Sequence, residues 1–394
     1  MSADWRRAMN SGSRALAAGP SAWSARPASA SPVASASPSS GASSASSASL
    51  LPAARGDAAR YPGQAGTAGA PATVLRGATG WRLLVIALLL VYPAVASPFF
   101  IFQIGGQSLA LGIIALSLTF LAGYGGMVSL AQMTIAGGAG YALAILGSSA
   151  AAQISLGWPW WLVLPLALLL ATLFATFIGW LSVRTEGIYT IMITLAIGVA
   201  YYYLMQQNYT VFNGFQGFSK VVPPQVFGVD WRSPMPFYYL ALACALAAYY
   251  FVRYLIRAPF GIAMQGIRDN PRRMSSLGFN VTAHRIAAYA LAGFIAAVGG
   301  ILLTWYNSLV TPGVVGVTAM INVLIISVLG GLGHPAAAFV GALVFVLLQN
   351  FAIDLVDRER FNLVIGGIFL LIVLFSPDGL FGLWKKIRGV GRWR

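Results

Sequence analysis

The chain has 394 residues, of which 58% are hydrophobic and 8% are charged, whereas charged residues make up about 25% of an ordinary soluble domain. This composition excludes a soluble globular protein and indicates a polytopic membrane protein. The formal net charge of +15 does not indicate nucleic-acid binding, because Lys and Arg collect in the cytoplasmic loops of membrane proteins.

Residues 1–80 form a region rich in Ala, Ser, Gly and Pro, with runs such as SASPVASASPSSGASSASSAS. Such a segment has too little large apolar surface to build a core, so we expect a disordered, low-complexity cytoplasmic tail. Arg6 and Arg7 could begin a twin-arginine export signal, but no apolar segment follows until residue 82. We therefore favour the cytoplasmic tail over the export signal.

Apolar runs separated by short polar breaks occupy residues 81–382 and predict an all-α bundle of about eight to ten transmembrane helices. Segments 318–331 and 127–147 are expected to be re-entrant or unwound, because the first is short and the second contains a cluster of glycines. The ten candidate segments are 82–102, 107–122, 127–147, 159–182, 188–206, 236–256, 284–306, 318–331, 336–353 and 361–376.

The charged loops predict an orientation. Alternate threading with the tail inside places Arg184, segment 253–285 and the basic C-terminal tail, residues 383–394, in the cytoplasm. The outer loops then hold fewer basic residues, accompanied by acidic ones. These basic residues are Lys220, Arg232, Arg358 and Arg360. The positive-inside rule therefore favours an inner-membrane protein with both termini in the cytoplasm.

The sequence offers the chain no energy source of its own. No Asp, Glu, Lys or Arg lies in the middle of an expected span, which argues against coupling to protons or sodium. None of the three lysines, Lys220, Lys385 and Lys386, follows the glycine that a phosphate-binding P-loop requires. We find no His, Cys or carboxylate pair at metal-ligand spacing and no catalytic triad. We therefore expect no enzyme, no cofactor and no metal site.

One internal segment, APFGIAMQGIRDNPRRMSSLGFN at 258–280, concentrates arginines. Asp269 or Asn270 can cap a short helix that begins at Pro271, and Gly278 can end it. Arginines in the first turn of this helix could simply contact anionic lipid headgroups. They could instead dock into a partner protein that drives the membrane domain.

Five segments, in this order and spacing, resemble the permease subunit of a branched-chain amino acid ABC importer of the Liv type. The resemblance extends over residues 82–382. The segments are GYGGMVSLAQMTIAGGAGYALA (123–144), EGIYTIMITLAIG (186–198), residues 257–280, VLGGLGHPAAAFVGA (328–342) and SPDGLFG (376–382).

The resemblance implies a fold and a set of partners. A second homologous permease subunit would share the translocation path, two cytoplasmic ABC ATPase subunits would bind beneath, and a periplasmic binding protein would deliver substrate. Residues 257–283 would be the segment that couples ATPase movement to transport. The coupling residues implied are Arg268, Asp269, Asn270, Arg272, Arg273 and Gly278.

The substrate path is predicted from glycine clusters and hydroxyl or amide side chains, which could line a hydrated gap between helices. Ordinary packing of small residues is the alternative for each position. The predicted path residues are Tyr124, Gly125, Ser129, Gln132, Thr190 and Thr194.

The predicted substrates are branched-chain amino acids or similar small polar solutes. The same permease type could serve urea, short amides or aromatic acids. An ion-coupled secondary transporter and a membrane scaffold protein are the alternatives from other classes.

Overall fold

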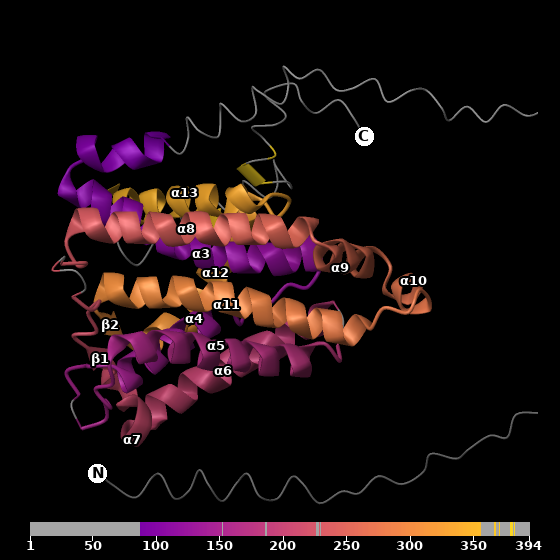
Figure 1. The fold of residues 1–394 in the computed structure, drawn as a ribbon, viewed down its shortest axis with the longest axis horizontal. Coiled ribbons are helices and arrows are strands. Elements are labelled where there is room, and N and C mark those ends of the chain that lie inside the picture. Colours follow the sequence, from indigo (N-terminus) through magenta and orange to yellow (C-terminus); the bar gives the residue numbers. More distant parts are fainter. Residues whose placement is uncertain are drawn as a thin grey trace, which may run out of the picture. The chain divides into compact units, whose positions relative to one another are not determined.

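The computed structural model describes residues 87–355, except 152, 186, 226–227 and 229, together with 366–367, 370, 379–380 and 382. The chain divides into two units, Met1–Gly69 and Ala70–Arg394, and every described residue belongs to the second. The predicted tails at 1–80 and 383–394 and the predicted span 361–376 lie outside the described residues, apart from residues 366–367 and 370 of that span. The described part is a bundle of helices with one two-stranded ribbon (Figure 1).

Five helices are long and apolar enough to cross a membrane. At 1.5 Å per residue, 20 residues cover the roughly 30 Å of a bilayer's hydrocarbon core. Four of these five helices confirm the spans predicted at 159–182, 188–206, 236–256 and 284–306. The five are Phe100–Tyr124, α5 (Trp160–Ser182), α6 (Ile188–Gln207), α8 (Pro234–Arg257) and α11 (Val281–Asn307).

The predicted boundary between spans 82–102 and 107–122 is wrong. Helix runs without a break through η1 (Phe100–Gly106), α3 (Gln107–Thr119) and η2 (Phe120–Tyr124), and the interruption lies at residues 96–97 instead. Gly105 and Gly106 do not end a helix, because they make room for aromatic rings from α8. A Cβ atom at Gly105 would lie 2.9 Å from the ring of Tyr238, and one at Gly106 would lie 2.9 Å from that of Phe237.

Two regions depart from simple membrane crossings, as predicted for segments 127–147 and 318–331. In the first of them the non-helical part precedes the glycine cluster that was expected to contain it. Helix α4 (Gln132–Leu146) has 15 residues, too few to cross, and follows the non-helical residues 126–131. The glycines expected to unwind the segment lie inside α4, where Gly137 packs against Val315 and Gly140 against Thr304.

Helices α12 (Val317–Gly330) and α13 (Pro335–Leu355) meet at a bend of 118°. The described residues therefore contain five full-length spans, or six if the bent pair counts as one. The predicted total of eight to ten also depends on segments outside the described residues.

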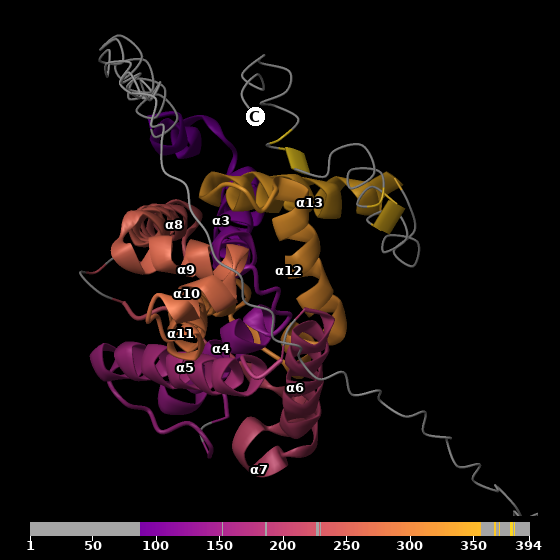
Figure 2. The ribbon, with the colours of Figure 1, turned by 90° about the vertical axis from the view of Figure 1, so that its right-hand side faces the viewer.

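The centre of the bundle is built on close helix contacts. Helix α4 lies in the middle and contacts α3, α5, α6, α11 and α12 (Figure 2). Helix α11 approaches its neighbours through small residues, since a Cβ atom at Gly293 would lie 2.0 Å from Ala175 and one at Gly300 would lie 2.1 Å from the carbonyl oxygen of Ala136. Contacts between small residues are the usual means by which membrane helices pack closely.

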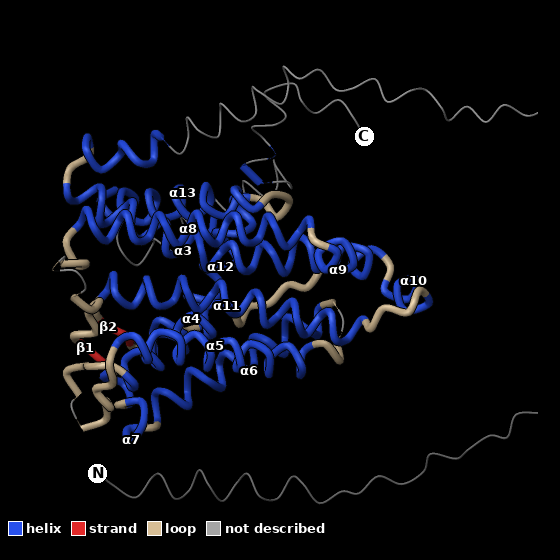
Figure 3. The backbone as a smooth tube through the Cα atoms, in the orientation of Figure 1, coloured by secondary structure: helices blue, strands red, loops and turns tan. Residues whose placement is uncertain are grey.

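The two ends of the bundle differ in structure (Figures 1 and 3). One end carries α9 (Pro259–Asp269) and α10 (Pro271–Ser276). The other carries the antiparallel pair β1 (Phe218–Ser219) and β2 (Leu309–Val310) and the short helices α7 (Tyr209–Phe212), η3 (Gly214–Gln216) and η4 (Pro312–Val315).

The basic residues are divided unequally between these ends. Among the described residues, Lys220 and Arg232 lie toward the strand end, and the other basic side chains lie toward the α9–α10 end. Those at the α9–α10 end are Arg184, Arg253, Arg257, Arg268, Arg272, Arg273 and Arg285.

Candidate functional site

Helix α9 follows α8 after a tight turn at Ala258 and contacts α8, α11 and η2. Pro259 begins α9, since a proline at the first helical position loses no hydrogen bond. Gly261 permits the close return, because a Cβ atom there would lie 2.1 Å from the carbonyl oxygen of Leu255. Met264 and Ile267 are buried beneath α9, so this helix is part of the packed bundle.

Helix α10 begins and ends as the sequence predicted. Asn270, rather than Asp269, is the cap, and its Oδ1 atom accepts a hydrogen bond from the backbone N–H of Arg273 at 3.0 Å. Gly278 follows the helix with φ +88°, a conformation that suits glycine. Asn280, which was not predicted as a cap, accepts at Oδ1 from the N–H of Ala283 and caps α11; an asparagine directly before an apolar helical run was the available signal.

Helix α10 is the most exposed helix of this end. None of its residues is buried, and Arg272 and Arg273 are exposed. Two apolar side chains follow it, Leu277 at 66% exposure and Phe279 at 40%. Together these four residues form a surface, here called the α10 knuckle, that combines positive charge with apolar area.

Arg268 turns away from the α10 knuckle and toward the membrane helices. Its Nη1 donates to the carbonyl oxygen of Gly123, and its Nε donates to Oδ1 of Asp269 at 3.1 Å. A Cβ atom at Gly126 would lie 2.4 Å from Cγ of Arg268. The six predicted coupling residues therefore occupy two places: Arg268 contacts residues 123–126, whereas Arg272 and Arg273 lie on the knuckle.

Residues 123–126, here called the junction, are the point where three parts of the chain meet. Gly123 lies against Leu332 in the α12–α13 turn, because an added Cβ would come within 2.1 Å of its carbonyl oxygen. The hydroxyl of Tyr124 donates to the carbonyl oxygen of Gly333 at 3.2 Å. Gly126 has φ +68°, which allows the helix to stop and the chain to continue as the non-helical residues 127–131.

The polar path residues surround the start of α4 inside the bundle. Ser129, Gln132, Thr190 and Thr194 are all buried. The Thr194 hydroxyl accepts from the N–H of Leu130 at 3.2 Å and donates to the carbonyl oxygen of Ile191 at 3.0 Å. It therefore satisfies a backbone donor that the unwound segment leaves without a helical partner.

Gln132 and Thr190 make different contacts. The Gln132 Oε1 accepts from the hydroxyl of Ser117 at 3.0 Å, whereas its Nε2 has no partner among the described residues. The Thr190 hydroxyl donates to the carbonyl oxygen of Thr185 at 2.9 Å. Thr190 also lines a cavity inside the bundle.

That cavity lies beside the junction and has a volume of about 50 Å³. It is lined by Val128, Ser182, Thr185, Thr190 and Tyr289, among others. A water molecule occupies about 30 Å³ of liquid, so the space suits one or two waters and is too small for an amino acid. We call this conformation closed because the side chains of Ser129, Gln132, Thr190 and Thr194 are buried in it.

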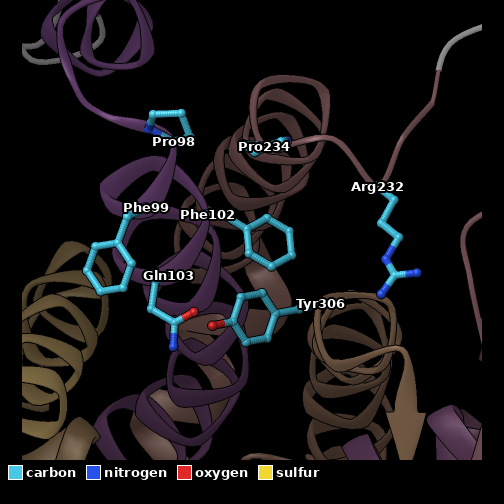
Figure 4. A pocket seen from close by; sticks show the side chains of 7 residues that line it. All are labelled: Pro98, Phe99, Phe102, Gln103, Arg232, Pro234 and Tyr306. Carbon is cyan, nitrogen blue, oxygen red and sulfur yellow. The ribbon is translucent and has the colours of Figure 1, made fainter.

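A larger cavity, which the sequence analysis did not foresee, opens at the strand end. Its volume is about 350 Å³, and its walls come from the start of the Phe100–Tyr124 helix, the beginning of α8 and the last turn of α11. Phe102 and Tyr306 stack within it at 4.8 Å between ring centroids, and Gln103 and Arg232 supply polar groups (Figure 4). None of the six predicted path residues lines it.

Among the described residues, no three His, Cys, Asp or Glu side chains gather as metal ligands would. The arrangement offers instead an exposed knuckle, a contact from α9 to a break in a membrane helix, and a half-length helix that begins inside the bundle.

Comparison with known proteins gives the family. Residues 100–374 match the family described as the branched-chain amino acid transport system permease component. The high-affinity branched-chain amino acid transport system permease protein LivM of Salmonella typhimurium is 26% identical over 326 residues, which are 76% of this chain and 74% of the relative. LivM of Escherichia coli is 25% identical over the same shares.

A ribose import permease protein, RbsC of Haemophilus influenzae, is 24% identical over 77% of this chain and 92% of its own length. No solved structure matches the chain. The family match covers more than two thirds of the 394 residues. The chain therefore belongs to the branched-chain amino acid transport permease family and is a membrane permease subunit of an ATP-binding cassette importer.

Proposed function

We propose that this permease imports branched-chain amino acids across the inner membrane, paired with a second homologous permease subunit. Two ABC ATPase subunits bind beneath the α9–α10 end, and a periplasmic binding protein delivers substrate at the strand end. The observation that carries the proposal is the α10 knuckle, which is exposed and is connected through α9 to a break in a membrane helix.

The orientation follows from the uneven charge. Seven of the nine basic side chains among the described residues lie toward the α9–α10 end, where Arg184 and Arg253 mark the helix ends. Because cytoplasmic loops carry the excess of Lys and Arg, this end faces the cytoplasm. We propose, as the positive-inside rule predicts from the full sequence, that both termini also lie in the cytoplasm.

Docking of a protein explains the α10 knuckle better than lipid contact does. Leu277 and Phe279 are exposed on a segment that extends beyond the membrane helices. Arginines alone would suit anionic headgroups, whereas apolar side chains bordered by arginines are typical of the centre of a protein interface. Arg272, Arg273, Leu277 and Phe279 therefore contact the ATPase.

The substrate path begins at the inner end of α4. Ser129, Gln132, Thr190 and Thr194 surround its first turn, and Tyr124 and Gly125 lie at the junction that precedes it. In other transporters, helices that begin near the middle of the bilayer direct their N-terminal N–H groups at bound substrate. Since these side chains are buried here, the path opens when the segment 126–131 moves.

The amino acid assignment is supported by the two LivM relatives, whose names specify branched-chain amino acids. The ribose permease relative is of similar identity and is covered over more of its length, so a sugar is the second candidate. Urea, short amides and aromatic acids are further candidates within the same transport class.

One experiment tests both the ATPase contact at α10 and the side of the membrane on which α10 lies. In a variant with Cys244→Ala, a cysteine at Ser275 should cross-link to a co-expressed ATPase subunit and react with a thiol reagent only from the cytoplasmic side. A cysteine at Val222, which is exposed near the strand end, is the matched control. It should not cross-link to the ATPase subunit and should not react from the cytoplasmic side. Reaction of Ser275→Cys from the outside, or cross-linking from Val222→Cys instead, would contradict the proposal.

The substrate is tested with the reconstituted complex and its binding protein. Radiolabelled leucine uptake should be competed by isoleucine and valine. If ribose, urea or benzoate competes and the branched-chain amino acids do not, the substrate assignment is wrong while the permease assignment stands.

A further inference from the structure

We propose that Arg268 is a positioning residue that transmits movement of α9 and α10 to the non-helical residues 126–131, and through them to the start of α4. This inference rests on the proposed function, because it assumes that an ATPase moves α10. It separates Arg268 from the arginines that bind the ATPase.

The first step is the contact between α10 and α9. Met274 of α10 packs against Gly266 of α9, where an added Cβ would lie 2.8 Å from the methionine sulfur. Asn270 is both the C-cap of α9 and the N-cap of α10, so the end of α9 and the start of α10 are held together at one residue. A push on α10 is therefore delivered to α9.

The second step is the contact between α9 and the junction. Arg268 donates to the carbonyl oxygen of Gly123, and its aliphatic stem lies against Gly126. Met264, which is buried, lies beside Gly125. One polar and one apolar side chain, separated by about one helical turn, thus connect the inner face of α9 to the junction.

The Gly123 carbonyl is a suitable point of attachment. It belongs to the last turn of the Phe100–Tyr124 helix, where carbonyl oxygens lose their helical partners. A guanidinium can satisfy such an oxygen and interacts favourably with the negative end of the helix dipole. Arg268 therefore caps the Phe100–Tyr124 helix at Gly123, just before the non-helical residues 126–131.

The third step leads from the junction to α4. Residues 127–131 have few backbone hydrogen bonds to neighbouring helices, and one of these is the bond from Leu130 to Thr194. The cavity of about 50 Å³ lies beside Gly126, Met127 and Val128 on the side of α5 and α11. Packed interiors resist movement, so this space gives the segment room to shift when Arg268 shifts.

The sequence separation supports a role beyond local capping. Arg268 and Gly123 are 145 residues apart, and each lies next to a separate mobile element in the proposed cycle. A residue with only a structural role would stabilise the closed conformation without making movement at residue 128 depend on nucleotide.

The experiment uses the complete complex with its binding protein, in nanodiscs, with Cys244→Ala and a reporter cysteine at Val128. The reporter's alkylation rate is measured without nucleotide and with ATP trapped by vanadate. Uptake per ATP hydrolysed is measured in proteoliposomes. The variants are Arg268→Gln, Arg268→Lys and the control Arg253→Gln, which removes the same charge from α8 at the same end.

We expect the alkylation rate to depend on nucleotide in the parent complex and in Arg253→Gln. In Arg268→Gln this dependence should disappear, and uptake per ATP should fall by a factor of about 5 to 150, the usual range of coupling between sites. Arg268→Lys should recover part of both, since lysine can reach a carbonyl but cannot hold Asp269 at the same time.

The outcomes separate the two proposals. If Arg268→Gln assembles, hydrolyses ATP and keeps both the nucleotide dependence and the uptake ratio, the relay is wrong and the permease assignment stands. If it loses only thermal stability, which Arg268→Lys restores, Arg268 is a structural cap and the relay is also wrong. If the parent complex shows no ATP-dependent uptake, the proposed function fails and the relay fails with it.

Discussion

Replacing Thr194 by valine tests whether the unwound segment is held by a side chain of α6. Valine has nearly the shape of threonine, so the packing at this buried position is retained. The N–H of Leu130, which donates to the Thr194 hydroxyl at 3.2 Å, loses its acceptor. The substitution also removes the bond that the hydroxyl donates to the carbonyl oxygen of Ile191, a loss that the control below shares in kind.

The expected loss in the free energy of unfolding follows from the burial of that donor. A buried donor left without a partner costs about 1–3 kcal/mol, whereas an average hydrogen bond between membrane helices contributes about 0.6 kcal/mol. Leu130 lies on non-helical backbone, so no helical carbonyl oxygen can replace the Thr194 hydroxyl as the acceptor for its N–H. We therefore expect a loss of at least about 1 kcal/mol, roughly a fivefold change in the ratio of folded to unfolded protein.

The assay is reversible denaturation of the purified permease in mixed micelles, with Thr190→Val as the matched control. Thr190 lies one turn earlier on α6, and its hydroxyl donates to the nearby carbonyl oxygen of Thr185. No backbone N–H donates to it among the described contacts, so its loss should be smaller. Equal losses for the two variants would refute the account of the unwound segment.

Two further predictions concern the coupling surface and the packed core. Exchange of Arg272 and Arg273 for glutamate should lower the amount of ATPase recovered by affinity purification, without reducing the permease in the membrane; unchanged recovery would argue against docking at α10. Gly300→Ala should destabilise the permease by about 1–3 kcal/mol, because the new Cβ would lie 2.1 Å from the carbonyl oxygen of Ala136. Gly333→Ala, with no atom within 4 Å of the new Cβ, should melt like the parent in thermal denaturation, and a similar loss in both variants would contradict the packing argument.

The long spans could be predicted from sequence because their signal is local. The segment predicted at 159–182 became Trp160–Ser182, and that at 236–256 became Pro234–Arg257. A run of about 20 apolar residues needs no information from elsewhere in the chain. A cap at Asp269 or Asn270 was similarly predictable, since capping depends on neighbours within a few residues; the structure selects Asn270.

The breaks were harder to predict because glycine has two uses. The predicted boundary between residues 102 and 107 contains Gly105 and Gly106, yet these glycines accommodate rings from Phe237 and Tyr238, far away in the sequence. The helix stops instead at Gly126, where the same residue type supplies a positive φ. Nothing local distinguishes these cases.

The contact that the Arg268 side chain makes could not be predicted from sequence either. Arg268 lies in the same short segment as Arg272, and the family resemblance gave both residues the same coupling role. Arg268 lies in the last turn of α9 and contacts Gly123, whereas Arg272 lies in the first turn of the next helix, after Asn270. Only the angle between the two helices, which depends on packing, separates their roles.

The central claim is that this permease has no energy source of its own and is moved by a separate ATPase. It is tested most directly by uptake of radiolabelled leucine into proteoliposomes that contain either the permease alone or the complete complex. We predict accumulation only with the complete complex, its binding protein and internal ATP, and none with the permease alone under a proton or sodium gradient. Gradient-driven accumulation by the permease alone would contradict the account.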